Sequence, residues 1–167
     1  HFLNIAGFGY DVAVLEDSWS VGYLEGPALY LYCALRQLGS YRGFSLEMEA
    51  DGRALGKSDL LMLIVANARI FGGGFRVAPH ADVEDGKLEA VVFGNMGFGG
   101  RVSALVRLLR GTHLKHPRVS AEKASRLVYR FAAPPAYETD GEWNQARSAE
   151  VVIEAVPRAL RVLVPAR

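Results

Sequence analysis

The alternation of apolar and polar positions along the chain predicts many short β-strands. Residues 44–50 (FSLEMEA) alternate cleanly, which indicates a half-buried antiparallel strand, and Asp51-Gly52 predicts a tight hairpin into residues 53–57. Apolar runs at about 60–67 and 87–93 predict two buried strands. Further strands are expected at about 118–131, 136–140, 150–156 and 159–164, with prolines as breaks between them.

Two segments have helical patterns instead. Residues 27–38 follow Gly26-Pro27 and end at Gly39, so proline and glycine stand where helices begin and end. Residues 101–110 predict an amphipathic helix. Residues 2–15 are interrupted by Gly7 and Gly9 and predict two short strands. The chain is therefore expected to form one mainly β domain over residues 1–167, a two-layer antiparallel β-sandwich with two or so helices.

Composition narrows the class of protein. The 19 Lys+Arg and 18 Asp+Glu residues leave a net charge of +1, which does not favour a nucleic-acid binder. A single cysteine, Cys33, excludes a disulfide framework and fits a reducing compartment. No apolar stretch approaches the ~20 residues that span a bilayer, and no signal peptide is visible. The sequence favours a cytoplasmic protein, and its strand-like opening suggests a fragment of a longer one.

The connection between the strands at 60–67 and 87–93 is unusually long. Hairpin loops usually have about 2 to 5 residues, and longer ordered connections are usually functional. This connection contains three consecutive glycines, Gly72–Gly74, and an acidic cluster around Asp82 and Asp85. The acidic cluster resembles half of a calcium loop, but its glycine comes at the fifth position instead of the sixth. From the residues alone, a plain Asp-Gly turn is favoured over a site for a hard cation such as Mg²⁺.

Two other segments can each be interpreted either as purely structural or as functional. Residues 138–143 (ETDGEW) end a strand and read by default as a turn, yet carboxylates beside one glycine can act as a general base and its orienting partner. Residues 101–118 carry five Lys or Arg residues and no acid. That pattern suits a helix with a solvated basic face, which is favoured, or a helix on an anionic membrane.

Taken together, these segments resemble a known family. FLNIAGFG, ANARIFGGGFRVAPHADVEDGKLEAVVF, TDGEW and VPRALRVLVP occur in the order found in the C-terminal domain of the diacylglycerol kinase and sphingosine kinase superfamily of lipid kinases, closest to its bacterial soluble branch. The resemblance covers essentially the whole chain. It implies transfer of the γ-phosphoryl group of ATP to a lipid hydroxyl, at a membrane surface, by a protein whose separate N-terminal domain binds the nucleotide. A homodimer is a further possibility.

The resemblance also implies roles for individual residues. Glu142 corresponds to the proposed proton acceptor, with Asp140 beside it. The Asp85 carboxylate and the main-chain carbonyls of Asp82 and Lys87 correspond to ligands of a structural Mg²⁺, which shifts the preference for this turn toward a cation site.

Gly72, Gly73, Gly74 and Asn67 are expected at the cleft that faces the nucleotide domain. Two rival functions remain at this stage, a non-catalytic lipid-binding or regulatory domain and an enzyme of NAD-kinase type with a soluble substrate.

Overall fold

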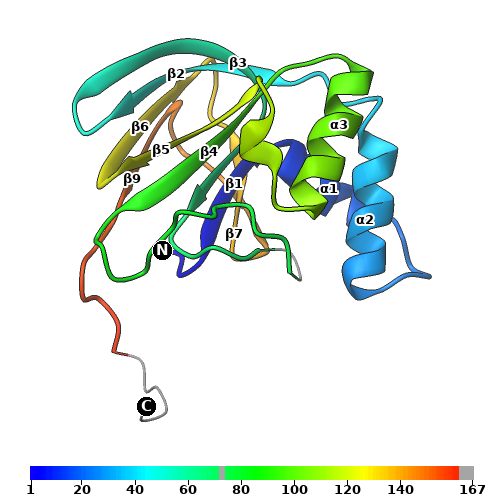
Figure 1. Ribbon diagram of the computed structural model, residues 1–167, viewed down its shortest axis with the longest axis horizontal. Helices are drawn as coiled ribbons and strands as arrows, with labels where there is room; N and C mark the ends of the chain where they lie inside the picture. Colours follow the sequence, from blue (N-terminus) through cyan, green and yellow to red (C-terminus); the bar gives the residue numbers. More distant parts are fainter. Residues whose placement is uncertain (72–73, 162–167) are drawn as a thin grey trace.

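The computed structural model describes residues 1–71 and 74–161 of the chain. Within these residues the chain forms a curled antiparallel sheet of nine strands, with three α-helices at one side (Figure 1). The strands are β1 (Ile5–Gly9), β2 (Phe44–Ala50), β3 (Arg53–Ala66), β4 (Leu88–Gly94), β5 (Val119–Ala124), β6 (Arg126–Phe131), β7 (Ala136–Thr139), β8 (Glu142–Gln145) and β9 (Glu150–Glu154). The helices are α1 (Tyr10–Ser18), α2 (Gly26–Gln37), α3 (Phe98–Leu109) and the 3-10 helix η1 (His113–Lys115). The predicted mainly β sandwich is confirmed.

Strand β3 belongs to both layers of the sandwich. Its N-terminal half pairs with β2, which continues through β6 to β9. Its C-terminal half lies between β1 and β4, from which the sheet continues to β7 and β8 on one side and to β5 on the other. A register shift between Leu60 and Met62 marks the change from one layer to the other.

Two hydrophobic cores lie on opposite faces of β3. Because side chains alternate along a strand, Leu63 and Val65 face the core between the layers, while Ile64 and Ala66 face the core under the helices. All four side chains are fully buried. This explains why the sequence of β3 reads as a continuous apolar run from Leu60 onward, as expected for a strand covered on both faces.

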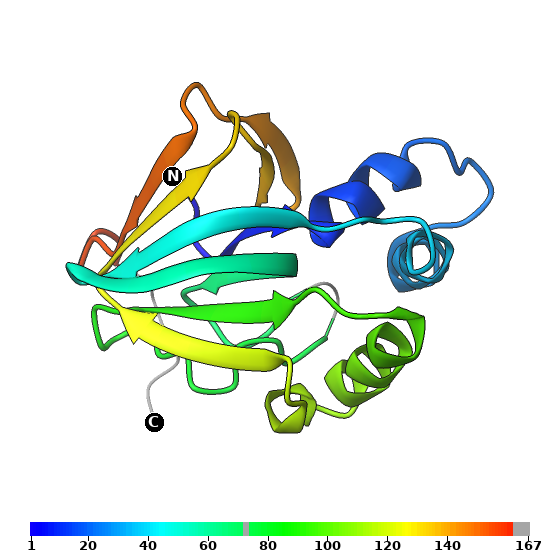
Figure 2. The same cartoon turned by 90° about the horizontal axis from the view of Figure 1, so that it is seen from above.

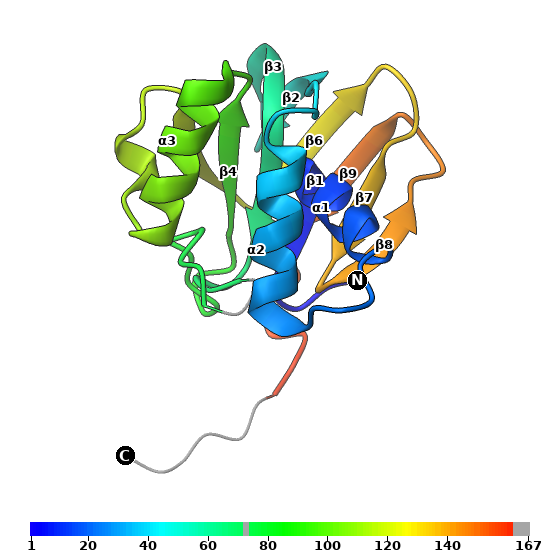
Figure 3. The same ribbon diagram turned by 90° about the vertical axis from the view of Figure 1, so that its right-hand side faces the viewer.

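The three helices lie on one face of the sheet. Helices α2 and α3 run side by side over β3 and β4, and α1 lies next to α2 (Figures 2 and 3). The Arg101 guanidinium joins α3 to the end of α2, because Nη1 donates to the carbonyl oxygens of Leu38 at 2.9 Å and Tyr41 at 2.6 Å. None of the described helices is long and apolar enough to cross a membrane.

Four sequence predictions need correction or refinement. Residues 10–18 form helix α1 rather than a second strand, because Gly9 turns the chain at φ 86° and the helix then packs on α2. The predicted strand at 118–131 is divided at Ser125, where the chain changes layers. Strand β8 was not predicted as a separate strand. Residues 159–161 of the predicted last strand are not in a strand, and residues 162–164 lie outside the described part of the chain.

The corner at Ser125 is held by one aspartate. Oδ1 of Asp51 accepts hydrogen bonds from the backbone N–H of Ser125 at 3.0 Å, the Ser125 hydroxyl at 2.8 Å and the backbone N–H of Arg126 at 2.8 Å. These bonds lower the pKa of the Asp51 carboxyl. Asp51, predicted only as a hairpin residue, therefore also joins the β2–β3 turn to the point where β5 becomes β6.

The burial of β3 predicts the effect of shortening its side chains. Leu63→Ala should lower the free energy of unfolding by about 2–5 kcal/mol, because it removes a fully buried side chain and leaves a cavity between the layers. Val152→Ala, at a side chain on β9 that is 43% exposed, should cost less than about 1 kcal/mol. Chemical denaturation of both variants measures the difference, and equal losses would contradict the placement of Leu63 in the core.

Candidate functional site

The predicted site residues converge on one end of the sheet. The register pairs Ile5 with Ala66, Ala66 with Glu89, and Ala6 with Thr139. The start of β1, the end of β3, the start of β4 and the end of β7 therefore lie at the same edge. Neighbouring strands are about 4.8 Å apart, so this edge spans about 15 Å from β7 to β4.

Asp140 clamps the N-terminal segment of the chain to this edge. Its carboxylate accepts hydrogen bonds from the backbone N–H of Leu3 at 2.7 Å and of Asn4 and Ile5 at 2.9 Å each. Partial burial alone would raise the pKa of Asp140, but the three donors hold it below its ordinary value. The predicted partner of Glu142 is thus an ionised carboxylate that is engaged by the backbone.

Asn67 holds the same segment from the other side. Its side-chain Nδ2 donates to the carbonyl oxygen of Leu3 at 2.9 Å. Its backbone N–H donates to the carbonyl oxygen of Asn4 at 2.8 Å. Gly74 follows in the connection, exposed and with φ 132°. Gly72 and Gly73 lie outside the described residues. Asn67 and Asp140 therefore meet through residues 3–5, although 73 positions separate them in the sequence.

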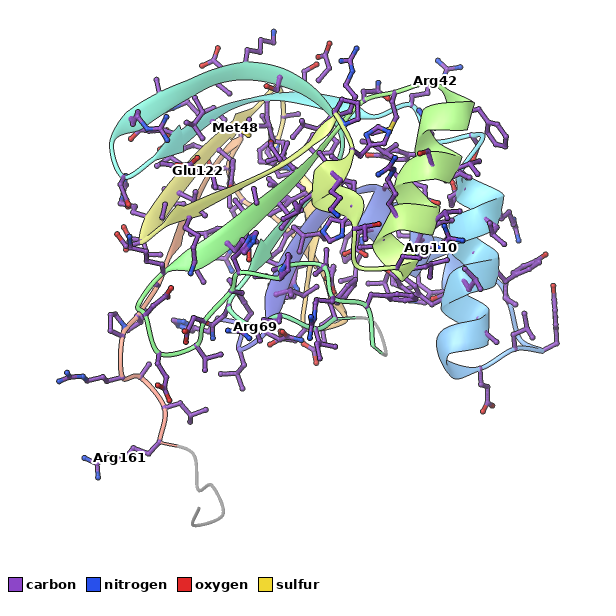
Figure 4. The ribbon with its side chains drawn as sticks, in the orientation of Figure 1. Arg42, Met48, Arg69, Arg110, Glu122 and Arg161 are labelled. Carbon is purple, nitrogen blue, oxygen red and sulfur yellow. The ribbon has the colours of Figure 1, made fainter. Side chains whose placement is uncertain are left out.

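The connection between β3 and β4 is ordered by polar contacts. The Arg69 side chain, labelled in Figure 4, donates from Nε to the carbonyl oxygen of Ala81 at 2.8 Å. The fully buried carboxylate of Glu89 accepts the backbone N–H of His80 at 2.8 Å and lies 3.1 Å from its ring Nδ1. Hydrogen bonds within the connection and to Glu89 therefore hold this long segment in place. Long ordered connections of this kind are usually functional.

Glu142 is an exposed carboxylate at the start of β8. Asp140 and Gly141 both have positive φ, at 52° and 91°, and form the two-residue turn between β7 and β8. Glu142 is the first residue of β8, opposite Thr139, and is exposed. The hairpin thus presents a solvent-accessible carboxylate directly beside the clamped Asp140.

A buried pair of acids lies behind this turn. Asp11 on α1 and Glu138 on β7 are each 2% exposed, and both approach the Cα of Gly7, where a methyl group would lie 2.1 Å from Oδ2 of Asp11 and 3.0 Å from Oε1 of Glu138. These two oxygens have no other hydrogen-bond partner among the described residues. Both oxygens adjoin the same methyl-sized space, and two buried carboxylates this close cannot both ionise at low cost, so the pair is expected to retain one proton between them.

The other oxygens of the pair connect α2 to the turn. The Tyr30 hydroxyl on α2 donates to Oδ1 of Asp11, and the backbone N–H of Gly141 donates to Oε2 of Glu138 at 2.8 Å. Burial, followed by the charge of Asp11, raises the pKa of Glu138 to about 9, and burial also raises that of Asp11. Sequence analysis missed this pair. Glu138 stood in the predicted acidic segment, but nothing in the sequence indicated that Asp11 would lie against it.

The Asp82–Lys87 turn lies at the β4 end of the edge. Oδ1 of Asp85 accepts the backbone N–H of Lys87 at 2.9 Å, and Oδ2 accepts the Lys123 ammonium at 2.5 Å. The Lys123 bond lowers the pKa of Asp85. Oδ1 of Asp82 accepts the backbone N–H of Glu84 at 3.0 Å. The turn contains carboxylate and carbonyl oxygens, the ligand type that Mg²⁺ prefers, and Lys123 supplies a cationic partner for Asp85. The described residues contain no cluster of three or more His, Cys, Asp or Glu side chains that could hold a metal ion.

An apolar cavity of about 500 Å³ opens between α1 and the two layers of the sheet. Phe8, Phe44 and Phe131 are among its lining residues. Glu16 also lines it and accepts a hydrogen bond from the Trp143 indole Nε1 at 2.8 Å. The cavity therefore opens at the end of β1 and the start of β7, away from the Asp140–Gly141 turn, and the bond of Glu16 to Trp143 connects it to β8.

The sequence of the chain is similar to those of known proteins. The family model of the YegS C-terminal NAD kinase beta sandwich-like domain matches residues 4–164. The diacylglycerol kinase of Mycobacterium tuberculosis (strain ATCC 25618 / H37Rv) is 27% identical over 164 residues, covering 98% of this chain and 52% of that protein. A Stenotrophomonas maltophilia (strain K279a) protein named "Probable lipid kinase YegS-like" is 28% identical over 175 residues, covering 98% of this chain and 52% of that protein.

A solved structure shows the same fold. The crystal structure of a Bacillus anthracis str. Sterne protein assigned as a diacylglycerol kinase superposes with a TM-score of 0.64 at 16% identity, covering 93% of this chain and 51% of that one. The chain thus spans about half the length of the relatives that it matches.

The buried acid pair predicts how stability depends on pH. The folded chain keeps the shared proton, whereas the unfolded chain releases it above the ordinary pKa of 4.5. The free energy of unfolding should therefore fall as pH rises from about 4.5 toward 9, by at most about 1.4 kcal/mol per pH unit for one proton. Glu138→Gln should flatten this slope, because the amide cannot ionise.

Thermal or chemical unfolding across that range measures the slope. Glu47→Gln, at an exposed carboxylate on β2, is the matched control and should leave the slope as in the wild type. A Glu138→Gln variant with the wild-type slope would show that the two acids do not share a proton.

Proposed function

The chain belongs to the family of YegS C-terminal NAD kinase beta sandwich-like domains, and from that premise we propose that it is the lipid-substrate domain of an ATP-dependent lipid kinase. The reaction is transfer of the γ-phosphoryl group of ATP to a lipid hydroxyl such as that of diacylglycerol. The family match over residues 4–164 is the observation that carries this proposal. The names of the similar proteins from M. tuberculosis and S. maltophilia support it.

Glu142 is the proposed general base. A lipid hydroxyl is a weak nucleophile, and a carboxylate within hydrogen-bond reach can take its proton as the hydroxyl oxygen attacks the γ-phosphorus and ADP leaves. The exposure of Glu142 on the turn suits this role. Asp140, with its carboxylate engaged by three backbone N–H groups, is proposed to position the turn on which Glu142 lies.

The nucleotide is proposed to bind mainly to an N-terminal domain that this chain does not include. Because the chain spans about half of its relatives, it supplies only one side of such a site. Asn67, at the same edge of the sheet as Glu142, is proposed to face that domain. The same role is proposed for Gly72–Gly74, of which Gly72 and Gly73 lie outside the described residues. On this proposal the chain alone does not transfer phosphoryl groups.

The apolar cavity at the end of β1 is the proposed site for part of the lipid tail. Its volume of about 500 Å³ and its phenylalanine lining suit a hydrocarbon chain. Glu16, which lines the cavity, accepts a hydrogen bond from Trp143, and this bond links the cavity to the strand that carries the proposed base. A soluble substrate of the kind used by NAD kinases would have no use for such a cavity.

Mg²⁺ is proposed to bind at the Asp82–Lys87 turn. The Asp85 carboxylate and the carbonyl oxygens of Asp82 and Lys87 would hold the ion, which would stabilise the connection rather than react. The ion must then share or replace the contact between Asp85 and Lys123, so Lys123 is expected to weaken metal binding.

Loss of the proposed base should abolish activity. In the longer natural protein, Glu142→Gln should lower phosphoryl transfer about 100-fold or more, because the amide cannot accept the proton. The measurement uses labelled ATP, Mg²⁺ and a panel of lipids in mixed micelles, with Glu47→Gln as the matched control. Labelling that survives Glu142→Gln would exclude Glu142 as the base. A folded, ATP-binding protein that labels no lipid would favour a non-catalytic lipid-binding domain.

Metal binding should depend on Asp85 and Lys123 in opposite directions. Added Mg²⁺ should raise the melting temperature of the wild-type chain, because a ligand that binds only the folded state stabilises it. Asp85→Asn should remove that shift, whereas Lys123→Gln should enlarge it by relieving competition for the carboxylate. A melting temperature that does not respond to Mg²⁺ in any of the three proteins would exclude this site.

A further inference from the structure

Helices α2 and α3 expose apolar side chains toward solvent. On α2 these are Leu31, Tyr32 and Leu35, and on α3 they are Phe98, Val102, Val106 and Leu109. Leu35 is 55% exposed and Phe98 is 63% exposed. These seven side chains are called here the helix face. A surface helix usually carries polar residues on its solvent-facing side. The helix face instead exposes apolar side chains to solvent.

The helix face is continuous across the two helices. Figure 3 shows α2 and α3 side by side on the same side of the molecule. The Phe98 ring lies within 4.0 Å of a methyl group placed at Gly39, just beyond the end of α2. On α3 the exposed members follow at intervals of four, four and three residues, which places them on one stripe of the helix. Tyr23, which is 72% exposed, stacks edge-on against Tyr32 and extends the apolar area beyond α2.

The two helices themselves carry charges of one sign, and the adjoining carboxylates are Asp17 of α1, which lies 3.3 Å from Arg36 of α2, and the exposed Glu25 before α2. Helices α2 and α3 contain no aspartate or glutamate, and Arg110 and Lys115 follow at the end of α3. Arg107 lies in the last turn of α3, and Figure 4 shows Arg110 at the C-terminal end of that helix. Helices that combine an apolar face with basic residues bind in the interface of anionic membranes.

We propose that the helix face docks the protein on an anionic lipid bilayer, with the apolar side chains among the head groups and acyl chains and the basic residues on lipid phosphates. The surface deepens the proposed function, because it brings the lipid-substrate domain to the bilayer that contains its substrate. Tyrosines at the edge suit this position, since their rings are apolar and their hydroxyls remain in contact with water.

The charge argues against a second copy of this chain as the partner. In a two-fold symmetric dimer the same surface meets itself. Two acid-free faces would then place arginine near arginine with no carboxylate of either helix pair to balance them. Anionic lipid supplies the missing charge.

Vesicle binding tests the proposal without ATP or a kinase assay, so its failure and that of the proposed kinase reaction are distinguishable. The 167-residue chain, with its fold checked by circular dichroism, is floated with phosphatidylcholine vesicles that either contain or lack phosphatidylglycerol. Binding is expected to both, and more strongly to the anionic vesicles. Phe98→Asp and Val106→Asp, at exposed positions, should each weaken binding about tenfold or more.

Two further variants separate the apolar and the charged contributions. Arg110→Gln should weaken binding about fivefold, and only to anionic vesicles. Val156→Asp replaces an apolar residue that is 67% exposed just beyond β9, outside the helix face, and it is the matched control that should bind as the wild type does.

Three results would overturn the proposal. The folded wild-type chain might fail to float with either kind of vesicle, or Phe98→Asp and Val106→Asp might float as well as the wild type. A longer natural protein that stays unbound while the 167-residue chain floats would assign the helix face to contact with the other half of that protein.

Discussion

The fold depends on the burial of β3 on both of its faces. The buried half of this strand, Leu60–Ala66, contributes alternate side chains to the interior of the sandwich and to the core under the helices. Hydrophobic burial is roughly proportional to apolar area removed from water, and a strand covered on both faces contributes twice. In the described part of the chain, β1, β2 and β4 pair with β3 directly, and the remaining strands add outward from these three.

The end of β3 also fixes where the site forms. Asn67 follows β3 directly and holds residues 3–5, and Asp140 holds the same residues from the β7 side. Each clamp satisfies backbone groups that the sheet leaves unpaired at its edge. The consequence is a rigid support for a turn that carries the exposed Glu142, with the long β3–β4 connection a few strands away.

The buried acids behind this turn are a costly way to support it. Asp11 and Glu138 lose hydration, and only a shared proton together with Tyr30 and Gly141 satisfies them. A well-packed apolar pair would have been a simpler solution for stability alone. The arrangement instead links α2, which carries part of the helix face, to the Asp-Gly-Glu turn through a chain of directional bonds.

The sequence by itself determined the main parts of this protein. Alternation at 44–50, the apolar runs around the long connection, and Pro27 and Gly39 around a helix predicted the sandwich and helix α2, because these patterns act locally. Ordered motifs along the whole chain identified the family and singled out Glu142, Asp140, Asn67 and the Asp82–Lys87 turn. What these residues do chemically stays a prediction.

Only the tertiary structure decided how those parts meet. Residues 2–15 were predicted as two short strands, yet the chain from Tyr10 to Ser18 forms a helix that packs on α2. The pairing of Asp11 with Glu138, the meeting of Asn67 and Asp140 at residues 3–5, and the contact of Asp85 with Lys123 all join positions far apart in the chain. No local pattern encodes such contacts, because they arise from strand register and layer packing, which depend on the whole chain at once.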